Sequence, residues 1–321
     1  MAIVGIDVGT GFCKAVSENR QVMFPNLVVV RYKSLWDHLK VRETTLVGDI
    51  AEKALSEPSR VLRSVSEGRI IHEVQYSLVA SEAIKRLGFK PEKTRAIVGV
   101  PCRTSKEEQE KLQKTFKEQV KLMDVKIYPS SYGTLLSMGL DSGVVIDIGE
   151  GTTDFLVVDK REIITVETLT VAVDSLLETT RNRIIMDYGI DLRQEEIRSL
   201  IMKTTESLSK YLPTIGIKTI THETVKDIIR EETTPLAEEI ASTTRTLLLH
   251  ASSEALKDII LTGGGSIIYK DALQTLIPEV RLKVPEDPVY ANAKGLYKIA
   301  EETYPRIMVE EENQIKKKEE K

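Results

Sequence analysis

The chain has 321 residues, with 45 Lys and Arg against 49 Asp and Glu, so its formal net charge is −4 at pH 7. A chain of this length usually forms two domains, and a mild negative charge excludes non-specific attraction to nucleic acid or anionic lipid. Two cysteines exclude a disulfide framework and a zinc-type cysteine cluster, and the short apolar runs exclude a transmembrane helix, so we expect a cytoplasmic protein without direct membrane insertion.

The chain begins with a predicted β-meander. An unbroken apolar run predicts a buried strand, and two further apolar stretches after a Gly-Thr-Gly turn predict two antiparallel strands. The three strands are residues 2–8, 11–17 and 21–30. Residues 31–69 are polar and contain Gly48 and Pro58 as breakers, so we expect a small excursion there and not a core element.

Helices and strands alternate in the next segment. Apolar residues at helical spacing predict a helix over residues 72–87, which Gly88 ends. Ser105 and Glu108 have the spacing of a capping box and open a second helix. The strands predicted beside these helices are residues 95–100 and 125–128.

The meander pattern then restarts, with predicted strands at residues 143–148, 153–159 and 163–170. Residues 174–257 have a mostly helical pattern, with breaks at Gly189 and at 213–216. The elements predicted after them are a strand at 258–262, a helix, a strand at 284–288 and a helix near 289–303. The charged block 309–321 is predicted to be disordered.

Strands, crossover helices and a doubled meander predict an α/β protein with two similar halves. The predicted first lobe is residues 1–139 plus about 289–308, with a small subdomain at about 31–69. The predicted second lobe is residues 140–288, with a mostly helical subdomain at about 173–257. The division places one glycine-rich turn in each half.

The turn in the first half has the residues of a phosphate loop. Gly9 and Gly11 let an anion approach the backbone N–H groups, and the Thr10 hydroxyl adds a donor. Lys14 follows on the returning strand, where its ammonium group can reach the same anion. Asp7 would repel phosphate unless a cation such as Mg²⁺ lies between them. An ordinary hairpin turn explains these residues equally well.

The turn in the second half repeats the pattern. Asp147 is followed by Gly149 and Gly151, and then by the hydroxyls of Thr152 and Thr153. The apolar positions also match, pairing Val4 with Val144, Ile6 with Ile146, and Val8 with Ile148. This repetition argues against coincidence and predicts two facing hairpins that hold the β- and γ-phosphates of a nucleotide.

A third glycine run follows the strand at residues 258–262. Gly263, Gly264 and Gly265 lead into a helix at Ser266, where bare backbone would suit a ribose and base and the helix N-terminus would favour phosphate. Taken alone, a glycine-rich entry to a helix explains this run better. No Walker-type phosphate loop and no Rossmann glycine fingerprint occur in the chain.

In this order and across nearly the whole chain, the three elements resemble the actin, hexokinase and DnaK-chaperone ATPase superfamily. The run Asp7–Lys14 is similar to the first phosphate loop of actin, and Val47–Ala51 is similar to the VGDEA stretch of actins. Phe24-Pro25-Asn26 resembles the entry found in ParM-type and archaeal actin-like filament proteins. The resemblance implies a duplicated, ribonuclease H-like fold with two lobes and a nucleotide cleft between them.

The resemblance also implies roles for these residues in binding ATP or ADP. Asp7 and Asp147 would organise Mg²⁺ through water. The residues implied for the β-phosphate side are Thr10, Gly11 and Lys14, beside Gly9. The residues implied for the β- and γ-oxygens are Gly149, Gly151, Thr152 and Thr153. The residues implied near the adenosine are Gly263, Gly264, Gly265, Ser266 and Tyr269.

One position departs from the superfamily pattern. Relatives usually carry Glu or Gln at the first connecting helix, where it positions the attacking water, and this chain has Ser130 there. A hydroxyl is a poor proton acceptor at neutral pH, so we expect slow ATP hydrolysis, with Asp154 or Glu150 able to substitute through a water. An ordinary helix N-cap is an equally good explanation of Ser130.

Together with a two-lobed clamp that couples nucleotide state to lobe angle, the resemblance to actin-like filament proteins implies an ATP-hydrolysing cytoskeletal protein that forms nucleotide-dependent filaments with itself. Its task would be DNA or plasmid segregation through an adaptor protein, with no direct nucleic-acid binding, or cell shape or division. The alternatives are a non-polymerising ATPase switch or chaperone-like regulator and a small-molecule kinase. No amphipathic helix precedes the first strand, which argues against membrane attachment by that route, and the 29% of charged residues points toward a thermophilic source.

Overall fold

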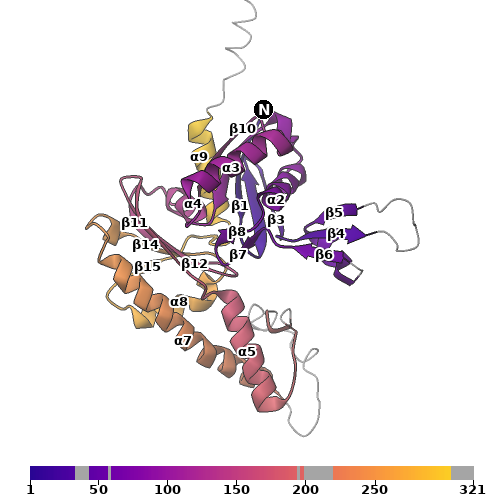
Figure 1. Ribbon diagram of the computed structural model, residues 1–321. Coiled ribbons are helices and arrows are strands. Elements are labelled where there is room, and N and C mark those ends of the chain that lie inside the picture. Colours follow the sequence, from indigo (N-terminus) through magenta and orange to yellow (C-terminus); the bar gives the residue numbers. More distant parts are fainter. Residues whose placement is uncertain (33–42, 57–58, 194–195, 199–219, 305–321) are drawn as a thin grey trace, which may run out of the picture.

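The computed structural model describes residues 1–32, 43–56, 59–193, 196–198 and 220–304 (Figure 1). Its two largest sheets each have five strands and form the centres of two lobes. The predicted helix break at 213–216 and the predicted tail 309–321 lie outside the described residues. Within the described part of the chain, no helix is both long enough and apolar enough to cross a membrane.

The sheet of the first lobe has the strand order β10-β9-β1-β2-β3. Its strands are β1 (Ala2–Val8), β2 (Phe12–Ser17), β3 (Arg20–Pro25), β9 (Thr94–Val100) and β10 (Asp124–Pro129). The central strand β1 runs antiparallel to β2 and parallel to β9. A parallel pair needs a crossover connection, so the chain between β3 and β9 must leave the sheet and return.

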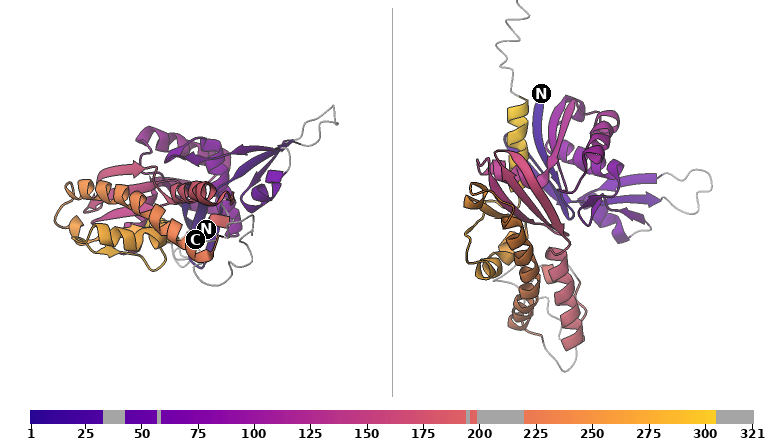
Figure 2. Two further views of the ribbon diagram at one scale, coloured as in Figure 1. Left: turned by 90° about the horizontal axis from the view of Figure 1, so that it is seen from below. Right: turned by 60° about the vertical axis from the view of Figure 1, so that its left-hand side comes forward.

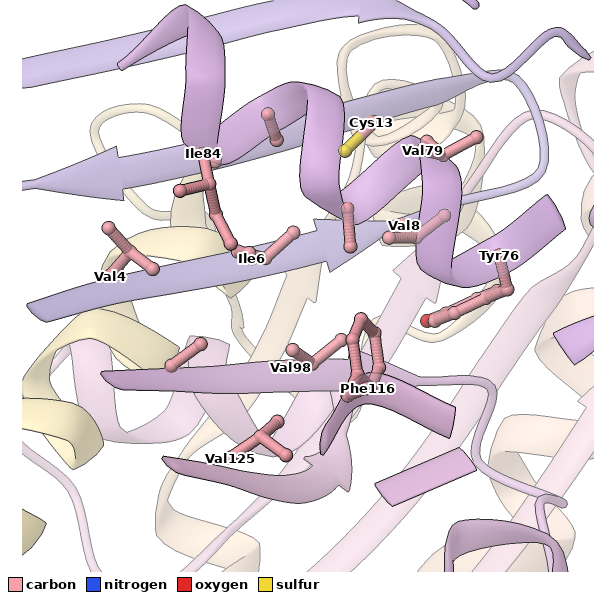
Figure 3. Packing of buried hydrophobic residues seen from close by; sticks show 14 of the residues in the cluster. Val4, Ile6, Val8, Cys13, Tyr76, Val79, Ile84, Val98, Phe116 and Val125 are labelled. Atoms are coloured by element: carbon pink, nitrogen blue, oxygen red, sulfur yellow. The ribbon is translucent and has the colours of Figure 1, made fainter. Parts of the chain in front are cut away.

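Two helices cover one face of this sheet and make the core shown in Figure 3. They are α2 (Glu73–Arg86) and α3 (Lys106–Thr115), followed by a short π-helix (Phe116–Val120). Val4, Ile6 and Val8 of β1 face these helices, while Ile3 lies in a separate buried cluster on the opposite face. Burial on both faces is the reason that β1 is apolar without alternation. The predicted capping box is present, because Ser105 and Glu108 cap α3 reciprocally.

The single strand predicted at 21–30 is wrong, because the chain forms two strands there. β3 ends at Pro25, and β4 (Val28–Tyr32) begins a separate three-stranded sheet with β5 (Glu43–Val47) and β6 (Ser59–Leu62). Between them the backbone N–H of Asn26 donates to the carbonyl oxygen of Gly11 at 2.8 Å, which turns the chain out of the first sheet.

The excursion predicted at about 31–69 contains most of this sheet, which projects from the first lobe (Figure 1). The short helix α1 (Asp49–Lys53) packs on it, and Val29, Ala51 and Ala54 form a small buried cluster. A hairpin of β7 (Val65–Ser66) and β8 (Arg69–Ile70) then leads the chain back to α2. The excursion therefore has a minor core of its own.

The sheet of the second lobe has the order β13-β12-β11-β14-β15, which repeats the topology of the first sheet. Its strands are β11 (Gly143–Ile148), β12 (Thr153–Asp159), β13 (Glu162–Leu169), β14 (Ile259–Thr262) and β15 (Leu282–Lys283). As in the first sheet, the central strand β11 is antiparallel to the next strand and parallel to β14. The predicted duplication is confirmed at the level of topology.

Within the part of the second lobe that the structure describes, the long helices are α5 (Val173–Tyr188), α7 (His222–Leu248) and α8 (Ser266–Leu276). Figure 2 (right) shows α5 and α7 extending together away from the sheet. The strand predicted at 284–288 is wrong, since β15 ends at Lys283. Pro285 and Pro288 lack backbone N–H groups, so they cannot continue the ladder.

Two helices cross where the lobes meet. The first, α4 (Ser130–Ser137), connects β10 to β11, and the second, α9 (Ala291–Thr303), returns from the second lobe and packs on β1. A Cβ atom at Gly295 of α9 would overlap the carbonyl oxygen of Gly133 in α4. The two backbones are therefore in direct contact, and we propose that the lobes divide after α4, near residue 139.

We predict that Gly295→Ala lowers stability by about 3 kcal/mol or more, because the added methyl meets backbone atoms that have no alternative rotamer. Thermal unfolding would measure the loss. Gly189→Ala is the matched control, since Gly189 has φ +70 but open space around it, and only about 1 kcal/mol of backbone strain is expected there. Equal losses in both variants would contradict the contact between the helices.

Candidate functional site

The two glycine-rich hairpins adopt the same backbone structure. In the first, the N–H of Gly9 donates to the carbonyl oxygen of Phe12 at 3.1 Å, and in the second the N–H of Gly149 donates to that of Thr152 at 2.8 Å. The strand registers also correspond, since Asp7 pairs with Lys14 and Asp147 pairs with Asp154. The duplication therefore extends to the residues at the turns.

The tips of the two hairpins lie against one another across a cleft. A Cβ atom at Gly11 would lie 2.8 Å from Cγ of Glu150, and one at Gly151 would lie 2.8 Å from Cγ2 of Thr10. Larger residues at either glycine would separate the hairpins. The glycines are thus required for the approach of the two lobes as well as for access to backbone N–H groups.

Asn26 holds the first hairpin from behind. Its side-chain amide donates to the carbonyl oxygen of Gly9 at 2.8 Å, and its backbone N–H donates to that of Gly11 at 2.8 Å. Ser64 donates to the Oδ1 atom of Asn26, also at 2.8 Å, so the amide is fully oriented. Asn26 was recognised in the sequence as part of a family motif, but its function as a clamp needs the tertiary structure.

Asp7 and Lys14 form a partly buried ion pair, with 3.4 Å between Nζ and Oδ2. Burial lowers the pKa of Lys14, but the charges of Asp7 and Asp147 outweigh burial and raise it overall. Lys14 therefore stays cationic between two carboxylates. It is placed to compensate a phosphate group that enters the cleft.

Asp147 is held by neutral donors from the two crossing helices. Ser131 of α4 donates to its Oδ2 atom at 3.1 Å, and Asn292 of α9 donates to the same atom at 2.7 Å. Thr134 of α4 in turn donates to Oδ1 of Asn292 at 2.7 Å. Burial raises the pKa of Asp147, although the bond from Asn292 lowers it. Sequence reasoning missed this network, since single polar residues in helices give no pattern.

The third glycine run packs on the end of β11. Gly263 has φ +81, and a Cβ atom there would collide with Asp147 and Ile148. The N–H of Gly265 donates to the carbonyl oxygen of Ile148 at 2.9 Å, while Gly264 has open space around it. The run thus completes one wall of the cleft directly beside Asp147.

One pocket brings most of the predicted residues together. Those that line it are Asp7, Gly9, Thr10, Gly11, Lys14, Ser130, Asp147, Gly149, Thr152, Gly263 and Gly264. Those that do not are Gly151, Thr153, Gly265, Ser266 and Tyr269. Three of these residues have hydroxyl groups that donate to backbone carbonyl oxygens. Thr153 donates to Val171 at 2.6 Å, Ser266 donates to Gly263 at 2.7 Å, and Tyr269 donates to Ala172 at 3.1 Å. These three side chains are structural in position, because each hydroxyl is already satisfied.

Ser130 lines the pocket as the first residue of α4. The N-cap interpretation of Ser130 is wrong, because Pro129 holds that position and no side chain caps the helix. A Cβ atom at Gly99 would lie only 2.5 Å from the Ser130 hydroxyl oxygen and would overlap it, so this serine packs tightly against the backbone of β9.

The helical subdomain contributes a cation that sequence reasoning missed. Arg198 lines the pocket, forms an ion pair with Glu150 and lies 3.8 Å from Asp174. Burial and the charge of Glu150 raise the pKa of Asp174 to about 7. The backbone N–H of Asp174 also donates to the carbonyl oxygen of Glu150 at 2.8 Å. The second hairpin is therefore tied to α5 and to Arg198.

The residues present fit a divalent cation held through water. Among the described residues, no group of three or more His, Cys, Asp or Glu side chains forms a direct metal site. Asp7 and Asp147 line the same pocket and are 4% and 9% exposed, and burial first and then the charge of Asp7 raise the pKa of Asp147. A cation between them would relieve this repulsion, and two carboxylates with water ligands suit Mg²⁺.

A model of the MreB/Mbl protein family matches residues 1–307. The chain belongs to this family. The predicted resemblance to actin-like proteins is therefore confirmed, and the MreB/Mbl branch is now known. A search among curated proteins found no match.

Solved structures share the fold of this MreB/Mbl protein. A MamK double helical filament aligns with TM-score 0.75 and 19% identity over 94% of this chain and 98% of that chain. MreB5 of Spiroplasma citri bound to ADP aligns with TM-score 0.72 and 17% identity over 95% and 99% of the two chains. The same protein bound to AMPPNP gives TM-score 0.73 and 20% identity over 94% and 96%. These structures confirm the predicted actin-like α/β fold.

We predict that the stability of the nucleotide-free protein falls as pH rises toward 7, in part because of Asp154. Burial raises the pKa of Asp154 to about 7, whereas an unfolded Asp has a pKa of about 3.9. Between these two pKa values the folded chain keeps the proton on Asp154 and the unfolded chain does not. The contribution of this proton to the free energy of unfolding is therefore complete below about pH 4 and is lost as the pH rises to 7. The loss amounts to at most about 1.4 kcal/mol for each pH unit.

Urea unfolding of the wild type and of Asp154→Asn from pH 4 to 8 measures this contribution. The variant should show a shallower loss of stability, because it cannot titrate at this position. Asp159→Asn, on the same strand, is the control and should keep the wild-type slope. An unchanged slope in Asp154→Asn would show that the carboxyl group is ionised throughout the range.

Proposed function

We propose that this MreB/Mbl protein is a cytoplasmic, ATP-binding cytoskeletal ATPase that assembles into nucleotide-dependent filaments. The observation that carries the proposal is the pair of matched hairpins facing one another across one pocket, each with a buried Asp at its base. The solved structures of MreB5 with ADP and AMPPNP, which share the fold, support a nucleotide as the ligand.

In the proposed complex, the first hairpin and Lys14 bind the β-phosphate side, and Gly149 and Thr152 bind the β- and γ-oxygens from the second lobe. Gly263 and Gly264 flank the adenosine. Arg198 is added to the set, because its guanidinium group lines the pocket. Gly151, Thr153, Gly265 and Ser266 shape the loops, and Tyr269 supports α8 from within the core.

Asp7 and Asp147 would hold Mg²⁺ through water. The ion would supply charge neutralisation at the phosphates and orient them. Ser131 and Asn292 keep one oxygen of Asp147 engaged, so the other oxygen is the one directed to the waters of the ion. Residues that orient a carboxylate facing the waters of an ion are expected to affect the affinity for that ion strongly.

Contacts across the cleft connect the phosphate site to the angle between the lobes. Gly68, at the turn of the β7–β8 hairpin, lies beside Thr168 and Thr152 of the second lobe. Arg103, after β9, forms an ion pair with Glu167 of β13. Loss of the γ-phosphate would remove the group that joins the two hairpins, and the closed form would then depend more strongly on protein contacts such as these.

The structure of a MamK double helical filament supports self-association as the output of this change. Among the predicted cellular roles, cell shape is the one that fits the MreB/Mbl family. DNA or plasmid segregation, an adaptor that links the filament to DNA, and a slow rate of hydrolysis stay predictions from the sequence.

We expect filaments with Mg-ATP and fewer or none with Mg-ADP or without nucleotide. Light scattering and electron microscopy of the purified protein would test this under the three conditions. A monomer that binds nucleotide under every condition would instead support a soluble ATPase switch. Absence of nucleotide binding would overturn the proposed function altogether.

We expect Asp7→Asn to weaken Mg-ATP binding by about 10- to 100-fold, because a carboxylate that orients the waters of the ion is lost. Titration calorimetry with Mg-ATP, repeated with ATP and EDTA, would measure the change. Asp159→Asn, at the far end of β12, should leave both affinities unchanged. A wild-type affinity for Mg-ATP in Asp7→Asn would contradict a cation bridge at this carboxylate.

A further inference from the structure

We propose that Asp154 is the catalytic residue that positions the attacking water and accepts its proton, and that one donor from each lobe orients it. This inference rests on the proposed ATPase function and names the group in the cleft that performs the hydrolytic step. It also accounts for hydrolysis in a chain whose residue at the start of α4 is Ser130.

The strand register places Asp154 where the first hairpin has Lys14. Asp7 pairs with Lys14 on the neighbouring strand, and Asp147 pairs with Asp154 in the same way. Both Lys14 and Asp154 line the pocket, from opposite lobes. A γ-phosphate between the hairpins would therefore have a cation on one side and a carboxylate on the other. Two anions repel each other, so a water molecule is the group expected between Asp154 and the phosphorus.

Asp154 has two donors, and they come from different lobes. Within the second lobe, the hydroxyl of Thr168 donates to Oδ1 of Asp154 at 2.6 Å. From the first lobe, the backbone N–H of Cys102, just after β9, also donates to the carboxylate. An ionised carboxylate has about four acceptor sites, so two remain for a water molecule.

The other carboxylates that line the pocket are less suited to accept a proton from water, because each is engaged by a cationic side chain or by the proposed ion. Asp7 is paired with Lys14, and Glu150 is paired with Arg198. Asp147 accepts from Ser131 and Asn292, and the proposed ion would compete for its remaining oxygen. Among the described residues of the pocket, Asp154 is the carboxylate bound by neutral donors alone and separate from the proposed ion.

The reaction balances with these groups. The oxygen of the water forms a bond to the γ-phosphorus, and the bond from that phosphorus to the β,γ-bridging oxygen breaks, so that its electron pair leaves with ADP. The proton released by the water goes to Asp154, and solvent removes it when the phosphate leaves. Removal of a general base of this kind typically lowers the rate by about 10²- to 10⁴-fold.

Because the two donors come from different lobes, the orientation of the Asp154 carboxylate depends on closure of the cleft. Cys102 reaches Asp154 only while the loop after β9 lies against the second lobe, where Arg103 pairs with Glu167. Gly68 lies beside Thr168, the other donor, at the same edge of the cleft. An open cleft therefore loses one of the two bonds that orient the carboxylate, and hydrolysis would be slowed until the lobes close.

The test compares steady-state ATP hydrolysis and nucleotide affinity in Asp154→Asn with the wild type. We expect kcat to fall by about 100-fold or more, with nucleotide affinity unchanged, because Asn keeps the shape of the side chain but cannot accept the proton. Thr168→Val should lower kcat by a smaller factor, and Thr168→Ser, which keeps the hydroxyl, should restore it. Asp159→Asn is the matched control and should keep wild-type kcat.

The outcomes separate this inference from the proposed function. A wild-type protein that hydrolyses ATP, beside an Asp154→Asn variant with the same kcat, overturns the role of Asp154 and leaves the ATPase function standing. A large loss in Ser130→Ala, with no loss in Asp154→Asn, would assign the water to Ser130. A wild-type protein without nucleotide binding would overturn both proposals.

Discussion

The backbone contact between α4 and α9 is the constraint on which the cleft depends. Gly133 and Gly295 allow the two helices to cross without side chains between them, and each helix begins at the pocket, which Ser130 and Asn292 line. Ser131 and Asn292, near those beginnings, both hold Asp147. A wider separation of the helices would move these donors away from the carboxylate. The packing of Gly133 against Gly295 thus fixes the two donors that hold Asp147, each of which lies within about one helical turn of its glycine.

Charge is the second constraint, because the cleft has several carboxylates and little solvent around them. Asp7, Asp147 and Asp154 are all buried, with Lys14 and Arg198 as the basic residues lining the same pocket. Burial and the neighbouring carboxylates raise the pKa values of Asp147 and Asp154, which shows that their ionised forms are unfavourable in this cleft. A bound cation would stabilise ionised carboxylates, and Mg²⁺ has this role in the proposed function.

Local sequence patterns predicted the parts of the fold that depend on local physics. The second meander, the first two strands of the first meander, the capping box of α3 and the glycine at the end of α2 were predicted correctly, because strand patterns, caps and positive φ are properties of a few adjacent residues. The strands predicted at 21–30 and 284–288 failed at Pro25 and Pro285. After Pro25, a long-range hydrogen bond from Asn26 to Gly11 turns the chain out of the sheet, and at Pro285 the backbone N–H that a strand needs is missing. Apolar composition alone did not reveal either effect.

The sequence by itself determined that two matching glycine-rich hairpins exist, with Asp7 and Asp147 at equivalent positions. It could not determine which hydroxyls are free to meet a ligand, because that depends on distant carbonyl groups such as those of Val171 and Ala172. Only the tertiary structure brought Arg198, Asn292 and the N–H of Cys102 to the cleft, each from an element remote in the chain. A hydrogen bond or an ion pair requires proximity in space, and proximity between distant residues is decided by how the lobes pack.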